Sequence, residues 1–187
     1  MTTDYKIYNF PYIEENLPDI IHHLEIAHAA FERMFPTLDS TWAYNKYNIF
    51  SLTGPSSHFY KIFKEIRNIV RENCGSDHEL WMQSWINYMS YEEIDRLDWH
   101  GHAFDYHGYV CIDPKKTYTD FKEYKIENKI GQIYLGPGYR HHKVEAIEPY
   151  QGKRITLGFD IVCDIQTSKF VKTTQLPWLD LSFIPLP

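Results

Sequence analysis

The sequence lacks the features that would place it in a secreted, membrane or nucleic-acid-binding class. It has three cysteines, Cys74, Cys111 and Cys163, and no Cys-x-x-Cys pair, so there is no disulfide framework and a reducing compartment fits best. No apolar run reaches membrane-spanning length, and the residues after Met1 contain no apolar signal region. The formal net charge of −6 gives no electrostatic case for nucleic acid or an anionic membrane as a partner. We therefore expect a soluble cytoplasmic protein.

Aromatic residues, by contrast, are abundant, with 15 Tyr, 11 Phe and 5 Trp. These side chains can build a large core, and tyrosine can line a semi-polar pocket. The length of 187 residues suits a single domain. We predict one domain over residues 1–187, without an internal repeat, and leave its oligomeric state open.

The N-terminal part, residues 1–79, is predicted to be largely helical. A first strand is expected over 5–12, and a helix over 14–34 because its apolar residues recur at helical spacing. A second helix is expected to begin after Ser56 or Ser57, either of which can cap it, and to end near Cys74. The aromatic-rich stretch 41–52 between the helices is expected to contain a strand.

From Leu80 onward the pattern changes to short strands separated by turn residues. Strands are expected over residues 80–89, 110–112, 121–126, 131–135, 144–147 and 154–162. Many short strands of this kind are typical of a sandwich or barrel. We predict a β core over about 80–162 with helices only before it, and an extended C-terminal arm over 163–187 packed on the surface. The fold class is therefore mainly β with N-terminal helices (α+β).

One short stretch holds most of the side chains that could bind a metal: Asp98, His100, His102, Asp105 and His107. In an extended chain side chains alternate between faces, so two of them, His100 and His102, would point the same way. Two imidazoles on one face can bind one metal ion, and a third ligand must then come from elsewhere. A His-rich polar loop without a metal is the competing interpretation.

A second group of candidates follows a Pro/Gly turn, where His141 and His142 enter another strand. A turn at a barrel mouth is a good position for a ligand, since the backbone there is fixed while the side chain faces inward. Only one of the two histidines should face inward. We expect this to be His142, on the same face as Val144, with His141 pointing away.

Arg154 leads a strand that is otherwise apolar. If its side chain points inward it needs a carboxylate or phosphate partner, because a bare buried charge is costly. An outward Arg154 on the solvent face fits the spacing equally well.

Five short motifs follow one another between residues 80 and 162: Trp85-Ile-Asn87, His100-Gly-His102, His107-Gly-Tyr109, His142-Lys-Val144 and Arg154-Ile-Thr-Leu-Gly-Phe-Asp160. In this order they resemble the Fe(II)- and 2-oxoglutarate-dependent oxygenases, most closely a small subgroup common in phage and marine bacterial genomes. The resemblance implies a double-stranded β-helix, which is a jelly-roll or cupin-like fold. For a phage-encoded protein the compartment would be the host cytoplasm.

The resemblance implies a dioxygenase that uses iron(II) and 2-oxoglutarate to hydroxylate a small molecule or a peptide, releasing succinate and CO2. His100, His102 and His142 would bind the iron, with no catalytic residue beyond these ligands. The commoner family motif has Asp where this chain has His102. Either His102 is a ligand, which gives an all-histidine triad, or a nearby carboxylate, Asp98 or Asp105, replaces it.

The resemblance also implies how 2-oxoglutarate would be held. Arg154 would clamp its far carboxylate as a two-pronged donor, and Thr156, two residues further on the same face, could donate to it as well. Tyr88, Asn87 or Tyr91 would complete the pocket, and the sequence does not choose among them.

Two other interpretations fit the same residues less well. One is a cupin-type, three-histidine metal dioxygenase that does not use 2-oxoglutarate, but it leaves Arg154 without a role. The other is a non-enzymatic β-sandwich binding module whose histidines lie on the surface.

Overall fold

The N-terminal helices form where apolar residues recur at helical spacing. In the computed structural model, which describes residues 4–75, 78–164 and 182–187, the helices are α1 (Tyr12–Glu15), α2 (Leu17–Met34), α3 (Ile49–Leu52) and α4 (Ser57–Cys74). The expected helix over 14–34 is divided at Asn16, and a proline lies in the first turn of α2, where its missing N–H costs little. Helix α4 has the predicted bounds.

The strand predicted within residues 41–52 is wrong, because local side-chain hydrogen bonds favour turns there. The Asp39 carboxylate accepts a hydrogen bond from the Thr41 backbone N–H at 2.8 Å. Asn48 caps α3 by accepting from the Phe50 backbone N–H at 3.0 Å. Short polar side chains of this kind compete with a strand ladder for the backbone donors.

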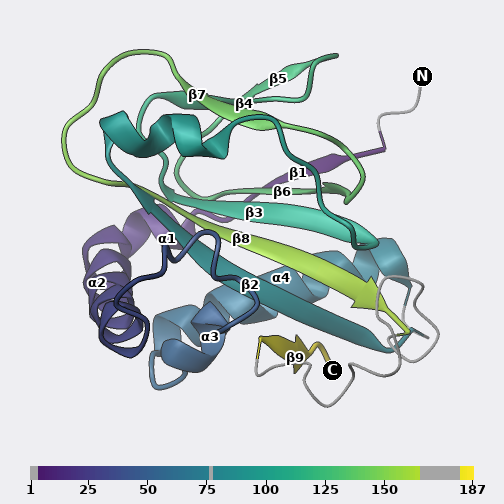
Figure 1. The fold of residues 1–187 in the computed structure, drawn as a ribbon. Helices are drawn as coiled ribbons and strands as arrows, with labels where there is room; N and C mark the ends of the chain where they lie inside the picture. The colour runs from purple at the N-terminus through teal and green to yellow at the C-terminus, as the bar shows by residue number, and fades with distance from the viewer. Residues whose placement is uncertain (1–3, 76–77, 165–181) are drawn as a thin grey trace.

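The strands form two antiparallel sheets (Figure 1). Their bounds are β1 (Lys6–Asn9), β2 (Leu80–Met89), β3 (Tyr106–Asp113), β4 (Thr117–Asp120), β5 (Lys125–Glu127), β6 (Gln132–Pro137), β7 (Lys143–Ala146), β8 (Arg154–Cys163) and β9 (Phe183–Pro185). The larger sheet has the order β1-β6-β3-β8-β2-β9, and the smaller has the order β5-β4-β7.

The strand pairs from Leu80 to Cys163 are nested like those of one long hairpin that has been rolled up. The outermost pair is β2 with β8, the next is an isolated bridge between His100 and His142, then β3 with β6, and innermost β4 with β5. The pairs β2–β8 and β3–β6 lie in the larger sheet, and β4–β5 lies in the smaller one. This is the jelly roll, or double-stranded β-helix, and the fold-class prediction is confirmed.

Alternation along the strands separates an apolar face of the larger sheet from a polar one. On β8, Ile155, Leu157, Phe159 and Ile161 are buried in the main core together with residues of α2 and α4. The helices therefore cover one face of the larger sheet, and the smaller sheet lies on the other side (Figure 1). The alternate residues of β8, which are Arg154, Thr156, Gly158 and Asp160, face the space between the two sheets.

Three further expectations differ from the structure. A 3₁₀ helix, η1 (Tyr91–Leu97), follows β2, closed by a capping box between Ser90 and Glu93, so helical structure is not confined to residues before Leu80. Of the strand expected over 121–126, residues 121–124 form the turn between β4 and β5, and only residues 125–126 are extended, as part of β5. Of the expected arm 163–187, residues 165–181 lie outside the described part of the chain, and residues 183–185 pair with β2 as a strand.

Within the described residues, no helix combines the length and the apolar character needed to cross a membrane.

Candidate metal centre

The bridge between the two histidine segments positions the candidate ligands. The His100 backbone N–H donates to the His142 carbonyl at 3.0 Å, and the His142 N–H donates to the His100 carbonyl at 2.8 Å. The imidazole rings of these two residues have centroids 4.4 Å apart, and the ring of His102 lies 5.4 Å from each. The structure thus brings together all three histidines that the resemblance names.

Each of these three rings has its Nδ1 beside an oxygen acceptor. His100 Nδ1 lies 2.6 Å from the Asp98 carbonyl, and His142 Nδ1 lies 3.3 Å from the Arg140 carbonyl. His102 Nδ1 lies 3.1 Å from a carboxylate oxygen of Asp160. Since these oxygens only accept, a hydrogen sits on each Nδ1, and Nε2 is the atom of each ring that is left to bind a metal.

The free Nε2 atoms fit a divalent cation. The ligand atoms of His100, His102 and His142 lie within 4.8 Å of one another, which allows nitrogen–metal distances of about 2.0–2.2 Å after small adjustments. His102 Nε2 is buried and has no hydrogen-bond partner among the described residues. A buried acceptor without a partner is costly, and a metal would satisfy it. Neutral imidazoles suit iron, zinc, copper and nickel alike.

A second group of possible ligands lies behind the first and shares His102. His107 and Asp160 oppose each other in the β3–β8 register, and His107 Nδ1 lies 2.9 Å from Asp160 Oδ1. The rings of His102 and His107 stack with centroids 3.6 Å apart. His102, His107 and Asp160 therefore form a candidate His/His/Asp metal triad. In the described structure the Asp160 carboxylate is engaged by both Nδ1 atoms.

Burial sets the charges in this cluster. It lowers the pKa of His107 to about 4 and, with the neighbouring imidazoles, the pKa of His142 well below its usual value. Burial alone would raise the pKa of Asp160, but His102 and His107 outweigh this and bring it to about 2. An anionic Asp160 with neutral His107 and His142 is the protonation state in which such groups bind a metal.

The other end of the polar face carries a buried cation. Arg154 is 2% exposed, with Nε 3.4 Å from Thr117 Oγ1 and an Nη 3.2 Å from Thr156 Oγ1. Among the described residues, no acidic side chain forms an ion pair with it, and burial lowers its pKa. The alternative of an outward Arg154 is therefore wrong.

The histidine cluster and Arg154 line the two ends of one cavity. Its lining includes the four histidines His100, His102, His107 and His142, and also Arg154, Thr156, Asn87 and Trp85. The Trp85 indole packs over Gly158, where a Cβ would lie 2.5 Å from the indole carbon Cε2. Only glycine allows this close approach.

The structure separates the residues that the sequence left as alternatives for the pocket. Asn87 lines the cavity and donates to Thr156 Oγ1 at 3.1 Å. Tyr88, the next residue on β2, points to the other face and stacks on His28 with ring centroids 4.5 Å apart. Tyr91 begins η1 and contacts Tyr150. Tyr88 and Tyr91 do not line the cavity, because strand alternation and the 3₁₀ turn direct them elsewhere.

The two alternative carboxylates are also placed elsewhere. Asp98 contributes its backbone carbonyl to His100, and the Asp105 carboxylate accepts from the Cys163 backbone N–H at 2.9 Å. His141 is exposed, as expected for the face opposite His142.

Sequence reasoning did not assign roles to His107, Asp160 or Thr117. The first two belong to quoted motifs, and Asp160 shares the alternating face of Arg154 and Thr156. That same-face relation was the available signal for Asp160. Nothing in the sequence linked Thr117, on β4, to Arg154.

Comparisons with known proteins show a likeness in fold at low identity. No protein-family model and no curated protein matches this chain. An oxidoreductase of the 2OG-Fe(II) oxygenase family from Burkholderia pseudomallei is 12% identical, with a TM-score of 0.43, over 56% of this chain and 58% of that one. A cupin-2 domain protein from Shewanella frigidimarina is 17% identical, with a TM-score of 0.32, over 42% and 69%. A cupin domain from Bordetella pertussis is 14% identical, with a TM-score of 0.31, over 46% and 85%.

Proposed function

We propose that this chain is an Fe(II)- and 2-oxoglutarate-dependent oxygenase that hydroxylates a small molecule or a peptide, with release of succinate and CO2. The observation that carries the proposal is the buried guanidinium of Arg154, which has no acidic partner among the described residues and lines the same cavity as three free imidazole nitrogens. A cavity that offers a cation at one end and metal ligands at the other suits a ligand that is both a chelator and a carboxylate.

His100, His102 and His142 would hold the iron through Nε2. When bound, iron with 2-oxoglutarate supplies the oxidising chemistry by which dioxygen is activated. Asp160 would not be a ligand but would hold His102 and His107 through their Nδ1 hydrogens. An outer carboxylate of this kind fixes the orientation of a ligand ring and raises its basicity.

Arg154 and Thr156 would bind the far carboxylate of 2-oxoglutarate. Thr156 Oγ1 already accepts hydrogen bonds from Asn87 Nδ2 and from Arg154. With both of its lone pairs engaged, the hydroxyl hydrogen is left to donate. Asn87 thus orients the threonine as a donor, and Arg154 adds a planar fork of donors beside it.

The test is a titration of the Fe(II)-loaded protein with 2-oxoglutarate without oxygen. We expect a visible charge-transfer band, since the keto and carboxylate oxygens together chelate the metal. Glutarate is the matched control, because it has both carboxylates but lacks the keto oxygen, and it should give no band. Absence of the band with 2-oxoglutarate, in protein that binds iron, would overturn the proposal.

A three-histidine metal dioxygenase that does not use 2-oxoglutarate is the second candidate. It is favoured by the donor set of His100, His102 and His142, which contains no carboxylate. It predicts iron binding without the charge-transfer band and no effect of Arg154 on ligand affinity.

A further inference from the structure

We propose that the substrate of this site carries a planar aromatic ring with a neutral hydrogen-bonding group attached to it. The inference rests on the proposed function for the identity of the metal chemistry, but its evidence lies in another part of the cavity. This part is formed by the loop between α2 and α3, which contributes Thr41, Trp42 and Tyr44 to the cavity lining.

The loop carries two exposed aromatic side chains beside the candidate metal ligands. Trp42 is 46% exposed and Tyr44 is 38% exposed, although large aromatic side chains are usually well buried. The Trp42 ring meets the His100 ring edge-on with centroids 5.8 Å apart, and Tyr44 lies 5.6 Å from Trp85. A ring stacked against Trp42 would therefore lie next to the metal ligands, and aromatic pairs gain energy beyond their buried area.

A polar atom in the same loop also lacks a partner. Thr41 is 3% exposed, and its Oγ1 is buried without a hydrogen-bond partner among the described residues. Because a buried hydroxyl without a partner is costly, the atom fits a ligand that carries a donor or an acceptor. Thr41 and Trp42 both line the cavity, so a ligand that contacts both carries its polar group close to the ring.

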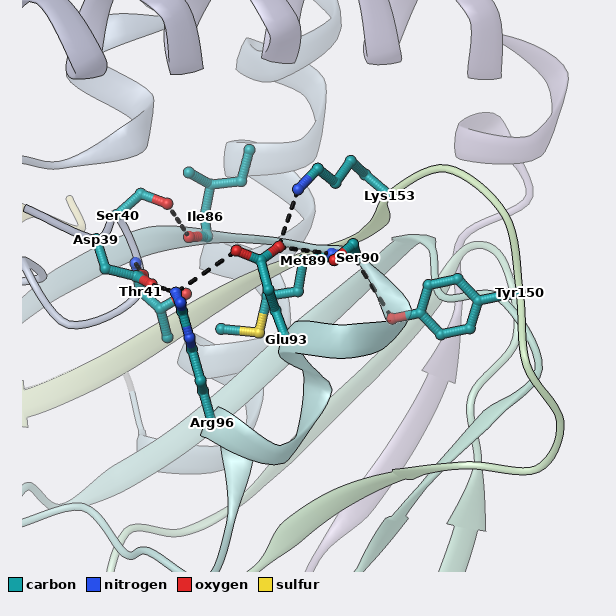
Figure 2. Close-up of polar contacts among 10 residues, drawn as sticks. All are labelled: Asp39, Ser40, Thr41, Ile86, Met89, Ser90, Glu93, Arg96, Tyr150 and Lys153. Atoms are coloured by element: carbon teal, nitrogen blue, oxygen red, sulfur yellow. Dashed lines mark hydrogen bonds and ion pairs between the residues drawn. The ribbon is translucent and has the colours of Figure 1, made fainter.

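A network of charges fixes this loop (Figure 2). Arg96 of η1 contacts Asp39 at 2.8 Å and Glu93 at 3.5 Å, and Lys153, just before β8, contacts Glu93 at 2.9 Å. Next to Thr41, the Ser40 hydroxyl donates to the Ile86 carbonyl of β2 at 3.2 Å. The aromatic faces are thus held in place before a ligand arrives, which reduces the entropy lost on binding.

The experiment compares two neutral probes, benzamide and cyclohexanecarboxamide, which share the amide and differ in the aromaticity of the ring. Binding is measured by NMR of the tryptophan indole N–H signals in protein loaded with Zn(II) and without oxygen. We expect benzamide to bind about three- to tenfold more tightly. Trp42→Ala should abolish this preference. Trp99→Ala is the matched control, because Trp99 is also exposed, at 38%, but does not line the cavity.

Thr41→Val tests the polar contact with a side chain of nearly the same shape. It should weaken both probes by the same factor of about fivefold and leave the preference for the aromatic ring intact. Equal affinities of the two probes for the wild-type protein, or a preference that survives Trp42→Ala, would overturn the inference. Since no step of this test uses 2-oxoglutarate, a failure here is distinct from a missing charge-transfer band, which would refute the proposed oxygenase.

Discussion

The two ends of the cavity satisfy their polar groups in opposite ways. At the histidine end, Nδ1 of every ring has an oxygen partner, and the remaining charge is the Asp160 carboxylate, beside two imidazoles. At the arginine end, a fully buried cation has only hydroxyl partners among the described residues. The difference teaches that the histidine end already orients its candidate metal ligands, whereas the cation at the arginine end has no acidic partner among the described residues.

The largest expected effect is at the arginine end. Arg154→Ala should weaken 2-oxoglutarate binding by about 2–5 kcal/mol, because it leaves the cosubstrate carboxylate without its partner. Arg154→Lys keeps the charge but loses the planar fork, so it should weaken binding less. The measurement is the Kd for 2-oxoglutarate and for Fe(II) without oxygen, and the Fe(II) constant should barely change. An unchanged 2-oxoglutarate constant would remove the cosubstrate role, and loss of folding in both variants would assign Arg154 to the scaffold.

At the histidine end, the pair His141 and His142 offers a matched comparison. His142→Ala should weaken metal binding by more than about 100-fold, which exceeds the cost of losing an outer partner of a ligand. His141→Ala should leave it unchanged, since this side chain is exposed. A metal titration of the two variants is the measurement. If His141→Ala lost the metal and His142→Ala kept it, the assignment of ligands would be reversed.

Asp160 should have an intermediate effect if it orients His102 from outside the metal's ligand set. Asp160→Asn removes the anion but keeps the shape, so metal affinity should fall by about 10–100-fold. Asp98→Asn is the control, because this carboxylate belongs to the same stretch and only its backbone carbonyl contacts His100. Loss of metal in Asp98→Asn, with none in Asp160→Asn, would restore the alternative ligand that the sequence left open.

The smallest effect concerns the partly exposed ion pairs next to the loop that carries Trp42. The hydrogen bond from the Ser90 backbone and the ion pair with Lys153 lower the pKa of Glu93 to about 2. Because the folded-state pKa is depressed, the stabilisation is present above about pH 4.5 and is lost as pH falls towards 2. Glu93→Gln should lower stability at pH 7 by about 1 kcal/mol, as for ion pairs near the surface, and should reduce the loss of stability between pH 4.5 and pH 2. Urea unfolding at pH 7 and pH 3 measures the free energy of unfolding and its dependence on pH. An unchanged pH dependence in Glu93→Gln would contradict the lowered pKa of Glu93.

How far the sequence predicted this molecule depended on whether a feature was local. Strand β2 and helix α4 were placed with the observed bounds, since each has a long, regular pattern. The stretch 41–52 misled because its aromatic residues suggested a strand, while Asp39 and Asn48 direct the backbone into turns. That prediction relied on the aromatic composition and did not take the capping side chains into account.

The candidate site shows the same limit. His100 and His102 were singled out by their spacing and His142 by its position at a strand start. The role of Arg154 was implied only by the resemblance to the oxygenases. The pairing of His107 with Asp160 depends on the register between β3 and β8, which no local pattern reveals. Thr117 reaches Arg154 only because the two sheets face each other.

The nested pairing of the strands also predicts the order in which the parts of the site assemble during folding. Closing a loop costs less entropy when an inner pair has already shortened it, so the rolled hairpin should zip outward from the β4–β5 turn. The bridge between His100 and His142 forms in such a sequence only after β3 has met β6, and Arg154 is enclosed last, when β8 joins β2. We therefore expect a metal to speed only the final steps of folding, and a nascent chain that ends before His142 lacks one of the three histidines of the centre.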